Sequence, residues 1–300
     1  MDIYFNIYKN IKKIKKMKEV KKMENSPSFD NSFVDKTLPT ISISNILSML
    51  QEPFDQKGVA EKTFNKRFND PTSEYYQMTV EQIIEKWEDK AATSRRYGKL
   101  NDDYIGIVLE GTADDKDLFC LDNDVDGDVR LNTQVRAFDE FIDDLPEHII
   151  FVAREVTLYY KICDHYVKGR FDALFYDTIK KKWIVVDWKT SGIIETKPTI
   201  WTTKLLGPAR IFDALNWNTY TMQVYFYKTA LIESGYLPEG TTFDDIDVCI
   251  VNFPGKEFED GKLYKKYPKA FDYDKDLMDG IFTFGIKKNI LLNKKNGGNN

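Results

Sequence analysis

The stretch from Lys168 to Thr190 holds residue types that could do chemistry; it reads KGRFDALFYDTIKKKWIVVDWKT and predicts two short strands joined by a polar turn. Asp172 lies near the start of the first strand, and Asp187 and Lys189 lie at the end of the second. Because side chains alternate between the two faces of a strand, Asp187 and Lys189 share one face and Trp188 points to the other. A hairpin would bring Asp172 alongside this pair.

Two carboxylates and a lysine at this spacing suit metal-assisted hydrolysis of a phosphodiester. Carboxylates supply hard oxygen ligands to Mg²⁺ or Mn²⁺. The bound metal acidifies a water molecule and offsets charge on the phosphoryl group, while the lysine can orient that water or stabilise the developing anion. The alternative is a surface hairpin with a solvated Asp/Lys pair, but the acid follows the apolar run 184–186, which favours a buried pair.

Three motifs, in order, resemble one enzyme family. G-R-F-D is followed by a hairpin, then by V-V-D-W-K-T, and then by Gln223 and Tyr227 in a Q-x-x-x-Y arrangement. The set resembles the PD-(D/E)XK nuclease superfamily, in particular its RecB-like and lambda-exonuclease-like branch, and is similar to the mitochondrial single-strand exonucleases, which share a DWKTS-type strand. The resemblance covers about residues 40–253. It implies an α/β fold with a central mixed β-sheet flanked by helices, as in restriction endonucleases.

The resemblance also implies roles for individual residues of the hairpin. Asp172 and Asp187 would bind Mg²⁺ or Mn²⁺, helped by the main-chain carbonyl of Trp188. Lys189 would position the attacking water. The active site is therefore expected where the strands of the two aspartates meet.

Two further acids are candidate metal ligands by resemblance. Family members often carry a glutamate in the preceding strand, and Glu155 lies within the strand predicted over 149–160. The alternative for Glu155 is an ion pair with a neighbour such as Arg170. A histidine position of the family falls on Asp102, or on Asn101 if the register slips, which is a departure from the family pattern. Asp102 could still bind a metal or a metal-bound water; the alternative is a solvated turn of a helix.

Substrate-binding residues are expected further along the chain. Gln223 and Tyr227 are four residues apart and share one face of a predicted helix. Facing the site, Gln223 would bind the substrate or orient the lysine, and Tyr227 would support phosphate or base; an ordinary amphipathic helix is the alternative. The stretch 190–216 interleaves aromatic residues with basic ones such as Lys204 and Arg210, which suits a single nucleic-acid strand. A poorly ordered insertion is the alternative there.

Composition excludes several other classes of protein. The chain of 300 residues has three cysteines and two histidines, too few and too scattered for a disulfide framework, a zinc site or an iron–sulfur cluster. It has no apolar run of about 18 residues and no apolar signal region, so we expect an intracellular protein in the cytoplasm of a host cell, neither secreted nor membrane-bound. A net charge of −5 does not exclude DNA binding, because a nuclease needs only a local basic groove.

The predicted organisation is one large domain with appendages. We expect a basic, flexible arm and linker over 1–37, the nuclease domain over 38–293 and a disordered tail over 294–300. The domain divides into a helical part over 38–145, a catalytic core over 146–253, and a C-terminal strand and helix over 254–293. The apolar pattern predicts the following elements: helices over 41–50, 59–68, 135–145, 218–234 and 274–293, a helix that starts from a capping box at Thr79 and Gln82, and strands over 149–160, 170–176, 183–189, 246–253 and 262–267.

Three functional hypotheses follow. The first is a Mg²⁺- or Mn²⁺-dependent DNA nuclease, preferably an exonuclease acting on single strands or duplex ends; the resemblance implies a role in viral or phage DNA replication, recombination or repair. The second is a nucleic-acid-binding or assembly protein that keeps the fold without turnover. The third is a structure-specific endonuclease. DNA is the expected partner in each case, and a homo-oligomer is compatible with all three.

Overall fold

The computed structural model describes residues 26–297, so the predicted basic arm up to residue 25 and the last residues of the predicted tail lie outside the described residues. The elements occur in this order: β1 (Thr40–Ser42), α2 (Ile43–Ser48), α3 (Gln56–Arg67), α4 (Val80–Glu110), α5 (Ala113–Asp122), α6 (Val129–Asp143), β2 (Ile149–Arg154), β3 (Thr157–Ile162), β4 (His165–Arg170), β5 (Ala173–Asp177), β6 (Lys182–Lys189), the short 3-10 helix η2 (Gly207–Ile211), α7 (Asn216–Glu233), the 3-10 turn η3 (Phe243–Asp245), β7 (Ile246–Asn252), β8 (Lys265–Tyr267) and α8 (Lys275–Gly297).

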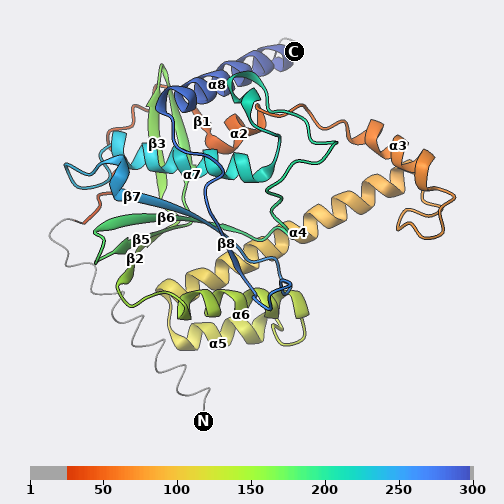
Figure 1. Ribbon diagram of the computed structural model, residues 1–300, viewed down its shortest axis with the longest axis horizontal. Coiled ribbons are helices and arrows are strands. Elements are labelled where there is room, and N and C mark those ends of the chain that lie inside the picture. The colour runs from red at the N-terminus through yellow and green to blue at the C-terminus, as the bar shows by residue number, and fades with distance from the viewer. Residues whose placement is uncertain (1–25, 298–300) are drawn as a thin grey trace.

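The strands form two mixed sheets (Figure 1). The larger has five strands in the order β2-β5-β6-β7-β8, in which β6 and β7 are parallel and the other neighbours antiparallel. The smaller has three strands in the order β1-β4-β3, with β1 parallel to β4. Helices α7 and α8 lie on one side of the larger sheet and α4, α5 and α6 on the other. The expected α/β fold with a central mixed sheet flanked by helices is confirmed.

Strand β6 is buried on both faces because it lies at the centre of the larger sheet. Trp183 and Val185 pack into the apolar cluster shared with α7, whereas Val186 and Trp188 pack into the cluster shared with α4 and α6. A strand covered on both sides needs a near-continuous apolar run, which explains its WIVV sequence. The Trp188 ring meets the Phe141 ring edge to face at a centroid distance of 5.4 Å, and this contact fixes the carboxyl end of β6.

The strand predicted over 149–160 is wrong in one respect, because the chain breaks at Glu155. Strand β2 ends one residue before it and β3 begins two residues after it, and the two strands belong to different sheets. Glu155 has a φ of +50°, in the left-handed region that residues other than glycine seldom adopt. The strand predicted over 170–176 is divided in the same way between β4 and β5.

The two breaks form a single corner, because the pairing register is the same on both sides of it. The last pair before the corner is Arg154 with Ala173, and the same register resumes in the smaller sheet from Thr157. It sets Glu155 opposite Asp172, whose carbonyl oxygen accepts a hydrogen bond of 3.1 Å from the Glu155 N–H. The four strands β2 to β5 are therefore one bent hairpin. The apolar pattern continues through the bend, so the pattern alone predicts straight strands.

Helix α4 is one continuous helix of 31 residues, about 46 Å long, which is longer than the sequence pattern indicated. Its predicted capping box of Thr79 and Gln82 is confirmed. The first turns of α4 pair with α3 in an arm that projects from the body at the right of Figure 1. The Trp87 ring holds this arm together, with centroids 6.2 Å from Phe54 and 6.4 Å from Tyr75.

Smaller differences from the predicted elements are local. The segment predicted as a helix over 41–50 begins with β1, which pairs with β4 before α2 starts. The sequence pattern does not predict α5, and α6 begins at Val129 rather than at residue 135, capped by the Asp128 side chain. The strand predicted over 262–267 is present as β8 at the edge of the larger sheet. Between residues 26 and 297, no helix is both long and apolar enough to cross a bilayer.

Candidate active site

The two aspartates of the hairpin meet at the carboxyl end of β6. The antiparallel register of β5 and β6 sets Asp172 opposite Asp187. The Asp172 carboxylate accepts a hydrogen bond of 2.5 Å from the Trp188 N–H. On the same face of β6, the Lys189 ammonium lies 2.5 Å from one Asp187 oxygen. The predicted arrangement of these four residues in space is thus present.

The Asp187 carboxylate is buried, and its one close donor in the described chain is the Lys189 ammonium. The residue is 1 % exposed, and neither carboxylate oxygen accepts an aligned hydrogen bond from any residue between 26 and 297. Burial raises the pKa of Asp187, although the Lys189 ammonium opposes this. Burial, and then the Asp187 charge, raises the pKa of Asp172 to about 8.

The lysine carries the only positive charge directly against these two acids within the described chain. Burial lowers the pKa of Lys189, but the charges of Asp187 and Asp172 more than offset burial, so the net shift is upward and the ammonium stays protonated. One ammonium cannot balance two buried carboxylates. Ionising both acids together is therefore costly, and a further cation beside them would lower that cost.

Helix α7 supports the lysine from the other side. The Gln223 side-chain oxygen accepts a hydrogen bond of 3.4 Å from the Lys189 ammonium, and the Gln223 amide donates one of 2.6 Å to the Tyr227 hydroxyl. The Lys189 ammonium also lies 4.5 Å from the centre of the Tyr220 ring. Sequence reasoning missed Tyr220, although its position three residues before Gln223 on the same helical face was a usable signal.

The close packing of α7 depends on a glycine just before the corner. A Cβ atom on Gly169 would lie 2.6 Å from the Phe226 ring and 2.8 Å from the Tyr227 ring. No side chain larger than hydrogen fits between β4 and α7 there. Tyr227 itself is 1 % exposed, and its hydrogen bond with Gln223 links it to Lys189.

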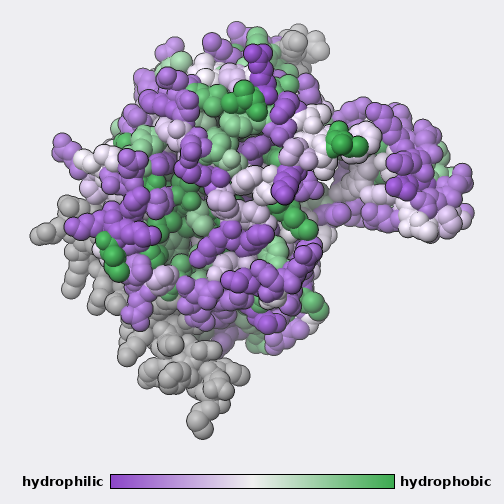
Figure 2. Space-filling model, in the orientation of Figure 1, coloured by the Kyte–Doolittle hydropathy of each residue, from purple (hydrophilic) through white to green (hydrophobic). Residues whose placement is uncertain are grey.

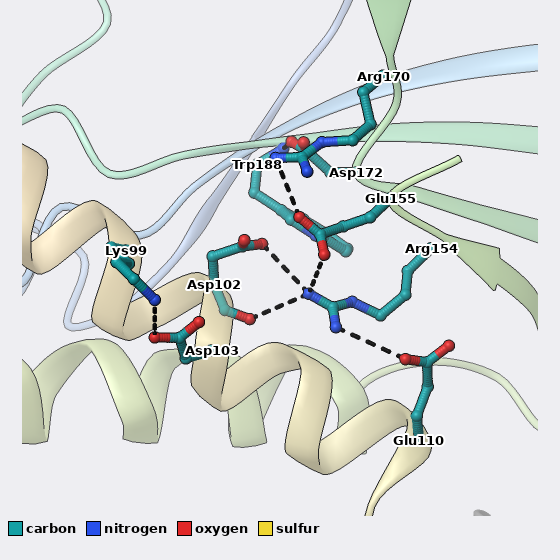
Figure 3. Close-up of polar contacts among 9 residues, drawn as sticks. All are labelled: Lys99, Asp102, Asp103, Glu110, Arg154, Glu155, Arg170, Asp172 and Trp188. Atoms are coloured by element: carbon teal, nitrogen blue, oxygen red, sulfur yellow. Dashed lines mark hydrogen bonds and ion pairs between the residues drawn. The ribbon is translucent and has the colours of Figure 1, made fainter. Parts of the chain in front are cut away.

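A second group of charges lies beside Asp172, on the side of α4 (Figure 3). The Arg154 guanidinium lies 3.2 Å from a Glu155 oxygen, 3.6 Å from an Asp102 oxygen and 3.6 Å from a Glu110 oxygen. The other Glu155 oxygen lies 3.1 Å from the Arg170 guanidinium, so the ion pair considered as the alternative for Glu155 is present. Arg154 therefore links the corner of the bent hairpin to α4.

Asp102 belongs to this second group rather than to a solvated turn. Burial, and then the nearby Glu155 charge, raises the pKa of Asp102, and the Asp102 charge contributes in turn to the raised pKa of Asp172. Gly106, one turn further along α4, makes room for the arginine, because a Cβ atom there would lie 2.2 Å from an Arg154 nitrogen. Sequence reasoning missed Arg154 and Gly106, and only the position of Arg154 next to Glu155 pointed to it.

The donor set fits a hard divalent cation. Among residues 26–297, no three His, Cys, Asp or Glu side chains form a preformed metal cluster. The paired acids Asp172 and Asp187 nevertheless offer carboxylate oxygens, those of Asp187 without aligned hydrogen bonds, and Mg²⁺ and Mn²⁺ prefer such oxygens and keep several waters. Asp172 and Asp187 would hold the ion. The main-chain carbonyl of Trp188 belongs to the residue that directly follows Asp187. Glu155 and Asp102 are engaged with Arg154 in this arrangement.

Two predicted substrate residues are not brought to the site. Lys204 forms an ion pair of 2.8 Å with Asp213, across the loop between β6 and α7. Arg210 lies in η2, which packs against α8. In the part of the chain that is described, neither side chain contacts the two aspartates or Lys189.

Comparisons with known proteins add no assignment: no family model matches the chain, and no curated protein matches it.

Proposed function

We propose that the protein is a metal-dependent nuclease of the PD-(D/E)XK type that hydrolyses phosphodiester bonds in DNA. The observation that carries this proposal is the buried Asp187 carboxylate, which lies beside a second carboxylate, Asp172, and has the Lys189 ammonium as its one close cation in the described chain. Two buried carboxylates beside one ammonium lack one positive charge, and an unbalanced buried charge is costly. Two such acids with a lysine suit the binding of a divalent cation and a phosphate.

Each residue of the site has one task in this mechanism. When bound, Mg²⁺ or Mn²⁺ would supply an acidified water and offset phosphoryl charge. Asp172 and Asp187 would hold the ion, and the Trp188 N–H fixes the Asp172 carboxylate. The Lys189 ammonium would orient the attacking water and stabilise the developing anion. Gln223 keeps the ammonium in place by accepting one of its hydrogens.

The finer points of the proposal come from the sequence resemblance alone. We favour an exonuclease that acts on single strands or duplex ends, with a role in viral or phage DNA replication, recombination or repair. Such an enzyme would work in the cytoplasm of a host cell, as a monomer or a homo-oligomer. A structure-specific endonuclease on the same site would use the same residues.

Digestion of end-labelled linear DNA, single- and double-stranded, with Mg²⁺ or Mn²⁺ tests the proposal. The wild type is expected to release short labelled products, EDTA to stop the release, and Lys189→Ala to abolish it. Lys182→Ala is the matched control, because Lys182 lies at the other end of β6 and pairs at 3.4 Å with the exposed Asp247. Cleavage of closed circular DNA would replace the exonuclease with an endonuclease. A wild type that leaves all substrates intact with either metal would overturn the proposal.

One observation favours a second candidate, a nucleic-acid-binding or assembly protein without turnover. The chain's own Arg154 cation pairs with Asp102 and Glu155, two acids that the resemblance offered as metal ligands. A site that had lost its metal could be balanced in this way. DNA binding that weakens with salt, in a wild type that does not cleave, would support this candidate.

A further inference from the structure

The middle of α4 is exposed on all sides. Residues 88–96 are all exposed, although the helix is packed against α3 before them and against the body after them. The exposed middle of α4 leads to the projecting arm formed by α3 and the first turns of α4. In Figure 2 this arm is covered mainly by hydrophilic residues. A surface helix normally buries an apolar stripe, and one that is polar all round is a bridge between two packed parts or needs charge pairs along its length.

Charge along this helix is divided into two sections. Before the middle, residues 81–89 contain four acids and one lysine. After it, residues 90–100 contain four basic residues and no acid; they are Lys90, Arg95, Arg96 and Lys99. We call Lys90, Arg95, Arg96 and Lys99 the basic section of α4.

The basic section is stabilised by its own helix only in part, through the ion pair of Lys99 with Asp103 and the contact of Arg96 with the Tyr97 ring. Lys90 has Lys86 four residues before it, and Arg95 has Lys99 four residues after it, so both spacings place like charges together. Lys86 and Lys99 are held by Glu74 and Asp103. Lys90, Arg95 and Arg96 have no ion-pair partner among residues 26–297. An exposed helix that repels itself would be stabilised by an anionic ligand.

The basic section lies next to the candidate active site. A Cβ atom on Gly98 would lie 3.3 Å from the Thr190 hydroxyl oxygen, and Thr190 directly follows Lys189. With a rise of 1.5 Å per residue, Arg95 is about 4.5 Å along the helix axis from this contact and Lys90 about 12 Å. Arg95 is thus close to the end of β6, and Lys90 lies further from the site along α4. With 3.6 residues per turn, Arg95, Arg96 and Lys99 lie within about 100° of one another around the helix, whereas Lys90 lies on the other side.

An exposed aromatic ring belongs to the loop that starts at the same point. The chain from Thr190 to α7 exposes Trp201 to 85 % and Ile200 to 90 %. An exposed tryptophan on a loop offers a flat surface on which a nucleic-acid base can stack, and exposed cations such as those of α4 can follow phosphates. Stacking needs an unpaired base, so this combination fits a single strand rather than a duplex.

We propose that the basic section of α4 binds the phosphate backbone of a single DNA strand, with Trp201 stacking on one of its bases. The strand would run from the arm toward Lys189, so that its end reaches Asp172 and Asp187. Only this last step rests on the proposed nuclease function; the binding surface does not require turnover.

Binding of a fluorescently labelled oligothymidylate in EDTA, measured by anisotropy over a series of salt concentrations, tests the surface. The double variant Arg95→Gln/Arg96→Gln removes two free cations, and we expect about tenfold weaker binding with a log–log salt slope smaller by about 1.4. The matched control is Lys62→Gln/Lys66→Gln, which removes two exposed charges from α3 on the same arm. Circular dichroism melting checks folding, which the first variant should not impair because it removes a like-charge contact.

The ring is tested separately by Trp201→Ala and Trp201→Phe. Loss of one stacked base is expected to weaken binding about 5- to 150-fold, with much of the affinity recovered by phenylalanine. A duplex of the same length should bind less tightly than the single strand.

Each outcome decides one of the two proposals. Binding by Arg95→Gln/Arg96→Gln that equals the wild type, or falls no more than in the α3 control, overturns the surface even if the enzyme cleaves DNA. Tighter binding of duplex overturns the single-strand assignment. If the wild type never cleaves with Mg²⁺ or Mn²⁺ but loses strand binding in the first variant, the surface stands and the nuclease proposal fails.

Discussion

Two buried aspartates at opposite ends of the β5–β6 hairpin differ in what their oxygens bind. Asp177, where β5 turns toward β6, is 3 % exposed, and Asp187, at the far end of β6, is 1 % exposed. One Asp177 oxygen accepts hydrogen bonds of 3.0 Å from the Ile179 N–H and 2.8 Å from the Lys180 N–H. Neither oxygen of Asp187 has a comparable donor within the described chain.

The pKa values of the two carboxyls move in opposite directions for this reason. Burial raises the pKa of Asp177, but the Lys180 and Ile179 N–H groups and the His148 side chain more than offset it, and the net shift is downward. The pKa of Asp187 is raised, because burial is opposed only by Lys189. Burial alone therefore does not distinguish the two acids; the main-chain N–H groups that bind Asp177, and that Asp187 lacks, do.

Exchanging each aspartate for asparagine gives the largest expected difference between the two ends. Asp187→Asn should lower the rate of metal-dependent DNA cleavage at least about 10²-fold, because a bound metal supplies several kcal/mol to the transition state. Asp177→Asn should leave the rate within a factor of about two, since its bonds serve only the turn. Initial rates on labelled DNA at saturating Mn²⁺ measure both. Equal losses in the two variants would remove the distinction.

Metal binding should stabilise the folded protein through the Asp187 end of the β5–β6 hairpin only. At a concentration of 100 times Kd, Mg²⁺ or Mn²⁺ should add about 2.7 kcal/mol to the free energy of unfolding. The gain should persist in Asp177→Asn and vanish in Asp187→Asn. Urea unfolding with and without the metal measures this gain, and a buffer with EDTA sets the baseline. A gain retained in Asp187→Asn would place the ion elsewhere.

The contribution of Asp177 to the free energy of unfolding should depend on pH. Asp177→Ala removes the acceptor of two N–H groups and should lower the free energy of unfolding by about 1–3 kcal/mol at pH 7. Because the folded pKa of Asp177 is below its unfolded value of about 3.9, this contribution is complete above that value and is lost as the pH falls through the folded pKa. Urea unfolding of both proteins at pH 7, 5 and 3 checks the trend. A difference that grew in acid would contradict the assignment.

The smallest effect is expected at the second group of charges. Arg154→Met should strengthen metal binding about tenfold, because it removes a positive charge beside the site and frees the Glu155 and Asp102 carboxylates, whereas Arg154→Lys keeps the charge and should change the affinity less. Gly106→Ala is a milder test, since its methyl group displaces the guanidinium without removing its charge. Titration of activity with Mn²⁺ gives the affinities. An unchanged midpoint in Arg154→Met would limit Arg154 to a role in folding.

The sequence predicted the parts of the site that depend on local geometry. The alternation of side chains along a strand placed Asp187 with Lys189, and a short turn placed Asp172 beside them. Helical spacing put Gln223 and Tyr227 on one face, and their hydrogen bond is present. Each of these placements spans one strand, one hairpin or one helical turn, so the periodicity of the sequence is enough to predict it.

The corner could not be predicted in this way, because nothing in the apolar pattern marks it. Glu155 adopts a left-handed φ that only surrounding contacts enforce, and Arg154 reaches α4 at Gly106 through a contact between distant parts of the chain. The sequence pattern did not predict the exposed middle of α4 either. It has no apolar period, so the sequence pattern resembles a loop even though the helix is continuous.

The bent hairpin has a consequence for how the site assembles during folding. Opposing residues of β3 and β4 meet across a tight turn, with Ile162 paired to His165, and pairing can extend from there to Glu155 and Asp172, which are 17 residues apart. The β5–β6 hairpin adds Asp187, a further 15 residues along the chain. Closing such short loops costs little chain entropy and is fast, whereas β6 must wait for β7, whose Ile246 pairs with Trp183 63 residues earlier. Glu155, Asp172 and Asp187 can thus come together as the two hairpins form one after the other, before the central sheet is complete.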